Sequence, residues 1–76
     1  MKHIVEVFDQ KTEVLLLSVD IAEHHEDALK VLMNWKQPED EFDGYDLSEE
    51  QINILEYWTG KQLSGVNRIV QLVCIE

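Results

Sequence analysis

Cysteine, glycine and long apolar runs are all scarce in this chain. A single cysteine, Cys74, among 76 residues excludes an internal disulfide and any metal site built from several cysteines. Three glycines, at positions 44, 60 and 65, are too scattered for a glycine-rich phosphate loop. No apolar run approaches the ~18 residues of a membrane-spanning helix. Glu6 stands where a signal peptide would have its apolar stretch, so we expect a cytoplasmic protein.

Basic residues are scarce as well. Six Lys and Arg stand against 16 Asp and Glu, which gives a formal net charge of -10. Phosphate contacts need Lys and Arg, so this balance argues against direct binding of nucleic acid or of anionic membranes. Residues 20–56 hold twelve acids and two lysines, whereas 1–19 and 57–76 are close to neutral. The acidic region is either a solvated face that keeps a small protein soluble or a surface for a basic partner.

The residues that are present predict an α+β fold in a single domain, 1–76. Two β-rich segments, 3–8 and 12–19, are separated by a short polar break and predict a β-hairpin. The run of leucines in the second segment predicts a central strand. Residues 68–75 predict a last strand. We expect a small antiparallel sheet, made of the hairpin plus the C-terminal strand, with two helices packed on one face.

Two helices are expected, over 22–35 and from Ser48 to Gly60. Asp20 and Glu23 have the spacing of a capping box for the first helix, and Pro38 follows its end. The second helix has Ser48 as its N-cap, Gln51 at the capping-box position and Gly60 as a stop. The predicted buried stripes are His25, Ala28, Leu29, Leu32 and Met33 in the first helix and Ile52, Leu55 and Trp58 in the second.

No arrangement of catalytic residues is recognisable in the sequence. General acid–base catalysis needs a carboxyl group whose pKa is raised by an apolar pocket, and a solvated acidic run provides the opposite environment. His24 and His25 are adjacent, so on a helix they point about 100° apart and do not easily share a metal ion. Cys74 lies in an apolar strand without a cationic neighbour. We therefore expect neither an enzyme nor a bound cofactor.

The segment from Glu39 to Glu50 is the densest in charge, with seven acids and no basic residue. Its first eight residues combine five acids with two aromatics, a composition typical of interfaces in which carboxylates steer a partner and aromatics anchor it. The alternative is that Phe42 and Tyr45 pack back onto the helices and hold the loop. The predicted partner-binding residues are Glu39, Asp40, Glu41, Phe42, Asp43, Tyr45 and Asp46.

The same segment also fits a calcium-binding loop in part. Counting from Glu39, acids occupy positions 1, 3 and 5, Gly44 occupies position 6 and Glu50 position 12, as in an EF-hand. The segment departs from that motif at position 1, where Asp is usual, and at position 8, where Asp46 replaces an apolar residue. A cation-binding module is therefore one alternative, and an acidic adaptor of unidentified partner is another.

The hairpin turn Phe8-Asp9-Gln10-Lys11-Thr12-Glu13 resembles the turn of small acidic bacterial immunity proteins. Cloacin-type immunity proteins, which neutralise ribonuclease bacteriocins, have a similar Phe-Asp-Lys-x-Thr-Glu hairpin, then a helix and further sheet. Small proteins encoded near polymorphic toxins are similar in layout, through Pro38-Glu39-Asp40, Gly44-Tyr45 and Ser48-Glu49-Glu50-Gln51. The chain departs from the pattern at Gln10 and in the last strand, where Gln71 is the only polar residue between Arg68 and Glu76. No binding residue is therefore carried over from the strands.

The resemblance implies an immunity protein that inhibits a cognate bacterial nuclease toxin. A nuclease is basic because it holds nucleic acid, so an acidic inhibitor can cover its groove or compete for it. Attraction between opposite charges raises association rates toward ~10⁸–10⁹ M⁻¹s⁻¹ at low salt. The expected partner is a basic protein toxin with a nuclease domain. We expect the acids of 39–50 to share one face with those on the outer side of helix 22–35.

Overall fold

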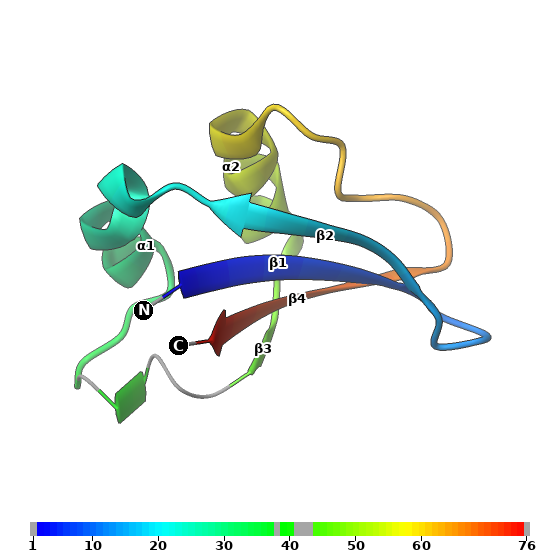
Figure 1. The fold of residues 1–76 in the computed structure, drawn as a ribbon, viewed down its shortest axis with the longest axis horizontal. Coiled ribbons are helices and arrows are strands. Elements are labelled where there is room, and N and C mark those ends of the chain that lie inside the picture. The colour runs from blue at the N-terminus through cyan, green and yellow to red at the C-terminus, as the bar shows by residue number, and fades with distance from the viewer. Residues whose placement is uncertain (1, 38, 41–43, 76) are drawn as a thin grey trace.

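A computed structural model of the chain describes residues 2–37, 39–40 and 44–75 (Figure 1). The elements follow the order β1 (Lys2–Asp9), β2 (Leu15–Ile21), the 3-10 helix η1 (Glu23–His25), α1 (Glu26–Leu32), β3 (Tyr45–Asp46), α2 (Glu49–Thr59) and β4 (Arg68–Ile75). The strands of this described part form one antiparallel sheet in the order β2-β1-β4-β3. The predicted α+β fold is confirmed, with the short strand β3 as an unpredicted addition.

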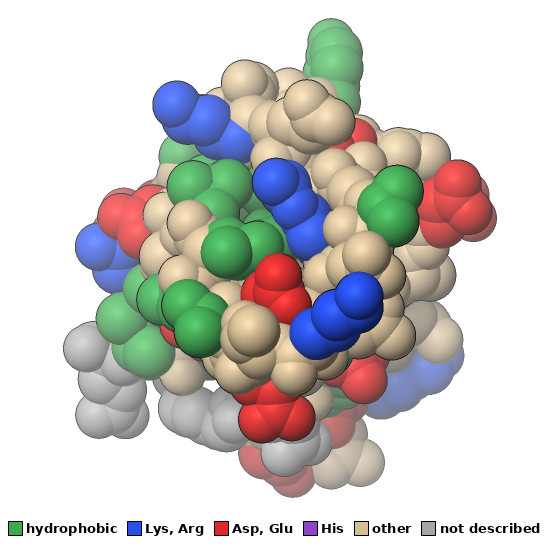
Figure 2. All heavy atoms as spheres, turned by 90° about the vertical axis from the view of Figure 1, so that its right-hand side faces the viewer, with side chains coloured by type: hydrophobic (Ala, Val, Ile, Leu, Met, Phe, Trp, Pro, Cys, Tyr) green, Lys and Arg blue, Asp and Glu red, His purple; other side chains and the backbone are tan. Residues whose placement is uncertain are grey.

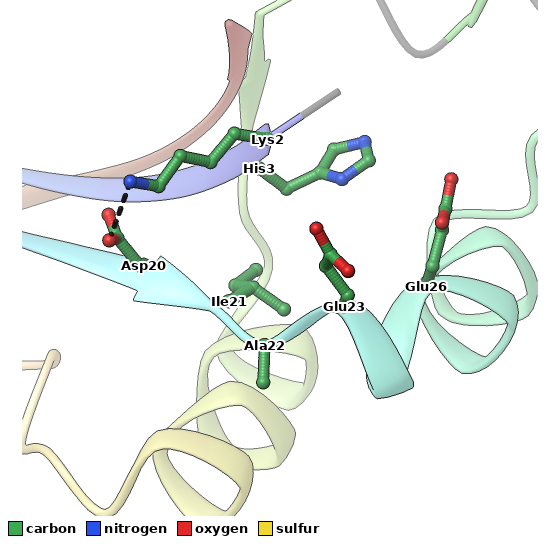
Figure 3. A pocket seen from close by; sticks show the side chains of 7 residues that line it. All are labelled: Lys2, His3, Asp20, Ile21, Ala22, Glu23 and Glu26. Carbon is green, nitrogen blue, oxygen red and sulfur yellow. Dashed lines mark ion pairs between the residues drawn. The ribbon is translucent and has the colours of Figure 1, made fainter. Parts of the chain in front are cut away.

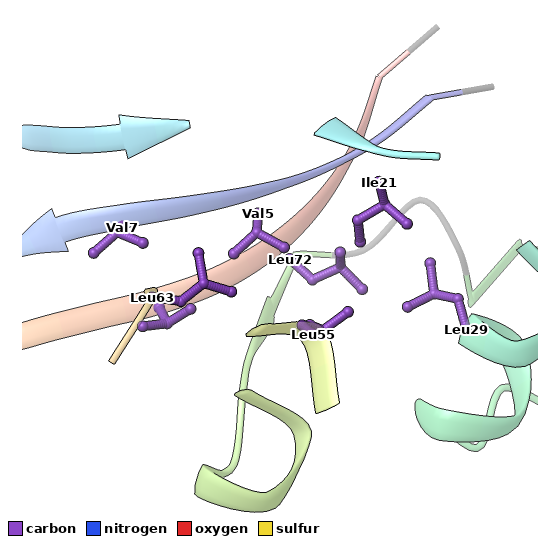
Figure 4. Close-up of a cluster of buried hydrophobic side chains, with 8 residues drawn as sticks. Val5, Val7, Ile21, Leu29, Leu55, Leu63 and Leu72 are labelled. Carbon is purple, nitrogen blue, oxygen red and sulfur yellow. The ribbon is translucent and has the colours of Figure 1, made fainter. Parts of the chain in front are cut away.

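Strand β1 shows how the sheet separates its two faces. His3, Val5 and Val7 are buried and point toward the helices, whereas Ile4 and Glu6 between them lie on the other face. The helices α1 and α2 both lie on the buried side of the sheet (Figures 1 and 4). Among the described residues, no element covers the other face, which we call the open face. Neither helix within the described ranges is long and apolar enough to cross a membrane.

The hydrophobic core gathers side chains from every major element. Strands β1, β2 and β4, both helices and the loop after α2 all contribute to one cluster (Figure 4). Its members are Val5, Val7, Ile21, Leu29, Leu55, Leu63, Val70 and Leu72. Of the predicted stripes, Leu29 and Leu55 are buried and Leu32, Met33, Ile52 and Trp58 pack against the cluster, but Ala28 is exposed. The helix periodicity therefore predicted the core positions of α2 fully and those of α1 in part.

The leucine-rich strand β2 lies at the edge of the sheet, so its predicted central position is wrong. β1 pairs with both β2 and β4, which leaves β2 with a single neighbour. Leu15 and Leu16 are 47% and 49% exposed, next to an irregularity in the ladder between β1 and β2. The physical reason is long-range: β4 returns beside β1 along all eight residues of that strand.

The first helix starts later than predicted. Asp20 is not its N-cap, because Asp20 belongs to β2, lies opposite Ile4 and forms an ion pair with Lys2 at 2.9 Å. η1 begins at Glu23 after Ala22, and no side-chain hydrogen bond caps it. The capping box predicted from the spacing of Asp20 and Glu23 is therefore absent, because pairing with β1 extends the strand through Ile21.

The first helix also ends earlier than the predicted residue 35. α1 stops at Leu32, and Met33 is its C-cap. Asn34 follows with φ 56°, a left-handed conformation that asparagine tolerates better than most residues and that ends the helix. The predicted terminator, Pro38, lies outside the described residues.

The second helix and the last strand have the predicted boundaries. The Ser48 side chain accepts a hydrogen bond from the Gln51 backbone N–H, and the Gln51 side chain accepts one from Ser48 N–H, which completes the capping box. Gly60 ends α2 with φ 70°. Asn67, with φ 60°, forms the turn that leads into β4.

Candidate functional site

The predicted partner-binding segment lies between α1 and α2 and is described in part. Glu41, Phe42 and Asp43 lie outside the described residues, so the structure places neither these acids nor the predicted anchor Phe42. Glu39 is exposed, as expected for an acid that meets a partner.

Asp40 has a structural task within its own turn. Its carboxylate Oδ2 accepts hydrogen bonds from the backbone N–H groups of Lys36 (2.9 Å) and Gln37 (3.1 Å). Its carbonyl oxygen accepts a hydrogen bond from the Tyr45 hydroxyl at 2.6 Å. Asp40 therefore binds the backbone of Lys36 and Gln37 through its carboxylate and the side chain of Tyr45 through its carbonyl.

Tyr45 packs inward rather than standing free. It is half-buried on β3, and its ring lies 5.8 Å from that of Trp35, which lies 5.6 Å from the ring of His3. Tyr45 thus takes the loop-holding role that the sequence analysis left as the alternative to an interface anchor. A partner can reach only the exposed remainder of this side chain.

Asp46 connects the acidic segment to the open face of the sheet. It is exposed, lies opposite Gln71 on β4 and accepts a hydrogen bond from Gln71 Nε2 at 2.9 Å. Gln71 in turn lies opposite Glu6 on β1. Beside this row, a shallow hollow of about 280 Å³ is lined by Phe8, Glu13, Ile69 and Gln71. Two acids, Glu6 and Asp46, therefore lie on the same sheet face as this partly apolar hollow.

A second acidic cavity lies where β2 passes into η1. It measures about 470 Å³ and is lined by Lys2, His3, Asp20, Ile21, Ala22, Glu23 and Glu26. Figure 3 shows the carboxylates of Glu23 and Glu26 directed toward the same side as the imidazole of His3. His3 is only 5% exposed, and the one cation of the lining, Lys2, is held by Asp20. The cavity therefore has the charge and size to receive a cationic side chain.

Most carboxylates of the described part have no cationic partner. The pair between Lys2 and Asp20 is the one ion pair found there. Backbone N–H groups bind Asp9 and Glu56 as well as Asp40: the N–H groups of Thr12 and Lys11 lower the pKa of Asp9. The N–H groups of Ser64 and Leu63 similarly lower the pKa of Glu56 below its ordinary value. The exposed acids Glu23, Asp27 and Glu39 form no ion pair in the described part and keep their charge available to a partner.

The two ends of the molecule's long axis carry different exposed charges. η1, α1 and the chain that leads to β3 lie at one end, and the turn between β1 and β2 lies at the other (Figure 1). Figure 2 looks onto the hairpin end, where Lys and Arg side chains lie among acids and apolar groups. The exposed acids Glu23, Asp27 and Glu39 belong to the first end.

The histidines and acids of the described ranges show no metal centre: no group of three His, Cys, Asp or Glu there could hold an ion. His25 stacks on Trp58 with ring centroids 4.7 Å apart and is half-buried, whereas His24 is exposed, as predicted. The calcium interpretation depends on Glu41 and Asp43 and so lies partly outside the described residues.

Three features of these surfaces escaped the sequence analysis: the burial of His3, the central position of Glu6, and the cavity at η1. Strand parity predicts the first, since His3 shares its side of β1 with Val5 and Val7. The position of Glu6 depends on β1 being central, which no local pattern shows. The cavity needs β1 and η1 to meet and has no signal in the sequence.

Comparison with known proteins places the chain in a family. A family model described as "Domain of unknown function (DUF7683)" matches residues 2–72. No curated protein and no solved structure matches the chain. The family match covers β1, β2, both helices and most of β4. The chain belongs to the DUF7683 family.

Proposed function

We propose that this chain is an acidic binding module that neutralises a basic partner, namely an immunity protein that inhibits a cognate bacterial nuclease toxin. The observation that carries the proposal is the uncompensated charge. The chain has a net charge of -10, and its described part contains one ion pair. Self-repulsion of this kind opposes folding, and a basic partner relieves it on binding.

The acidic end of the molecule offers the first contact for such a partner. Glu23 and Glu26 line a cavity there, and Glu39 and Asp46 are exposed on the chain that leads to α2. Although Lys30 on α1 and Lys36 after it are exposed at the same end, a basic surface that approaches there meets more acids than bases. Attraction of this kind accelerates association, which suits an inhibitor that must capture a toxin before it acts.

The proposal predicts that a basic protein is encoded beside the gene for this chain, and that protein is the partner used in the test. The two proteins are mixed at equal concentration, and the cleavage of RNA and of DNA is measured with and without this chain. We expect stoichiometric inhibition of one of the two activities. Absence of binding at low salt, or binding that leaves both activities intact, would overturn the assignment as an immunity protein.

A pair of charge-reversal variants locates the binding surface. Glu39 lies at the acidic end and Glu13 lies at the hairpin end, and both side chains are exposed. The two variants are Glu39→Lys and Glu13→Lys. Both substitutions change the net charge by the same amount, so any difference between them reports the position of the charge. We expect Glu39→Lys to slow association at low salt several-fold more than Glu13→Lys, because Glu39 lies on the proposed binding surface. Equal effects would contradict this placement of the site.

A calcium titration tests the cation-binding alternative. Tryptophan fluorescence of the free protein should stay unchanged as calcium is added; a saturable response would favour that alternative.

A further inference from the structure

The open face of the sheet carries one polar row between two apolar rows. The polar row crosses all four strands and consists of Ser18, Glu6, Gln71 and Asp46. On one side of this row Ile4 lies opposite Val73, and on the other side Phe8 lies opposite Ile69. These four apolar side chains are half-buried, and both helices lie on the other side of the sheet (Figure 1). The face therefore has the layout of an interface centre, with a few polar groups among apolar ones.

Glu6 holds an uncompensated carboxylate at the centre of this face. It belongs to β1, which has a neighbouring strand on each side, and its side chain is half-buried. Its cross-strand neighbours are the uncharged residues Ser18 and Gln71. Among the described residues, no ion pair or hydrogen bond reaches the Glu6 carboxylate. A carboxylate that loses part of its water without gaining a partner destabilises the free chain, and a cation brought by another molecule offsets that cost.

Basic side chains contribute little to the open face. Lys2 lies on this face, and Asp20 holds its ammonium group at 2.9 Å. Arg68 belongs to β4 but shares its side of that strand with buried core residues, so it points to the helix side. Within the described strands, the open face therefore carries Glu6 and Asp46 as acids without a base beside them.

The charge of the open face favours a basic protein as its partner. A second copy would bring its own acids against Glu6, and nucleic acid or an anionic membrane would bring phosphate groups of the same sign. A lysine or arginine of a protein would meet Glu6 with opposite charge, and apolar side chains around it would cover the two apolar rows. Glu6 and Asp46 stand two strands apart, about 10 Å at the usual strand spacing, so each needs its own basic residue.

We propose that the open face is a second contact surface for the basic partner, with Glu6 as its central ion-pair acceptor. This surface continues from the acidic end, because Asp46 belongs both to the chain that leads to α2 and to the polar row. Carboxylates at the acidic end accelerate the encounter, whereas Glu6 is covered in the complex and slows dissociation. This inference rests on the proposed function, since it needs a basic protein partner.

The first test needs only the free chain. Glu6→Gln keeps the length of the side chain and removes its charge. We expect the melting temperature of Glu6→Gln to lie above that of the wild type, and to rise more than that of Glu39→Gln, which removes the same charge at an exposed position. Circular dichroism at neutral pH and low salt measures both variants. A melting temperature of Glu6→Gln below that of the wild type would show that the carboxylate stabilises the free chain, and would overturn the proposal.

The second test measures binding to the basic protein encoded beside the gene, whose nuclease activity the wild type should inhibit. Glu6→Gln should dissociate from that protein at least about tenfold faster than the wild type, whereas Glu39→Gln should mainly slow association. Dissociation of Glu6→Gln at the wild-type rate would overturn this inference and leave the proposed function intact. A wild type that does not bind that protein would overturn the proposed function, and this inference with it.

Chemical labelling locates the covered surface without relying on binding energies. Ser18→Cys lies beside Glu6 in the polar row, and Val66→Cys lies at a 90% exposed position in the loop after α2; both are made in a Cys74→Ser background. Saturating partner should slow maleimide labelling of Ser18→Cys at least about tenfold, because the centre of an interface excludes water, and should leave labelling of Val66→Cys unchanged. Labelling of Ser18→Cys in the complex at the rate of the free chain would overturn the proposal.

Discussion

Individual carboxylates of this chain fall into two groups that the composition alone cannot separate. Asp9, Asp40 and Glu56 accept backbone hydrogen bonds and hold turns or loops. Glu23 and Glu39 are exposed without a cation beside them in the described part. Acids of the first group contribute to stability, whereas acids of the second group cost stability through repulsion and are available for binding.

Glu56 offers a test of the first group. Its Oε2 accepts hydrogen bonds from the N–H groups of Leu63 (2.7 Å) and Ser64 (3.0 Å), and Leu63 is fully buried in the core. These bonds lower the pKa of Glu56 below its ordinary 4.5. The stabilisation is therefore present above about pH 4.5 and is lost as the pH falls through the lowered folded-state pKa.

Glu56→Gln should lower the melting temperature at pH 7 and flatten its dependence on pH between about 6 and 3. Glutamine keeps one acceptor oxygen but loses the charge, so the variant has less stability to lose on acidification. Thermal unfolding followed by circular dichroism measures both effects, with Glu39→Gln as an exposed control. An unchanged pH profile in Glu56→Gln would show that these hydrogen bonds do not carry the acid sensitivity.

At the scale of the elements, local signals predicted α2 and β4, and long-range pairing decided the rest. Ser48, Gln51 and Gly60 specify both ends of α2 within one segment. Asp20, in contrast, has a side chain suited to an N-cap, yet pairing with β1 and the ion pair with Lys2 extend the strand beyond it. β3 consists of two residues and exists because β4 lies beside it, so no periodicity predicts it.

The sequence predicted where the acids of the candidate site lie, but not how its side chains pack. The density of acids in 39–50 is visible in the sequence, and Glu39 and Asp46 are exposed as that density suggests. The inward packing of Tyr45 depends on Trp35 and on the carbonyl of Asp40, which tertiary structure brings together. Composition therefore indicates where the charge lies, but not which side chains the fold itself uses.

The cap of α2 gives a prediction at this scale. Ser48→Ala removes the acceptor for Gln51 N–H and half of the capping box, which should lower the free energy of unfolding by about 1 kcal/mol. For a domain of this size, that corresponds to a fall in melting temperature of about 4–8 °C. Ser48→Asn, which keeps a capping oxygen, should retain most of the stability. A loss as large in Ser48→Asn as in Ser48→Ala would contradict the role of the cap.

At the scale of the whole molecule, two surfaces of different charge lie at different places on one small fold. The exposed acids Glu23, Asp27 and Glu39 belong to the end formed by η1, α1 and the chain that follows α1, whereas the one acid of β2, Asp20, is paired with Lys2. Binding at the acidic end should weaken as salt rises, because salt screens the attraction between the carboxylates and a basic partner.

The most direct measurement of the central claim is the association rate of this chain with the basic protein that the proposal expects to be encoded beside it, followed by stopped-flow tryptophan fluorescence at increasing NaCl. If uncompensated carboxylates steer the encounter, the rate constant should fall at least about tenfold between roughly 20 and 200 mM salt, with less change in the dissociation rate. A rate constant that does not change with salt, and is the same for Glu39→Lys as for the wild type, would contradict the claim that the acidic surface captures the partner.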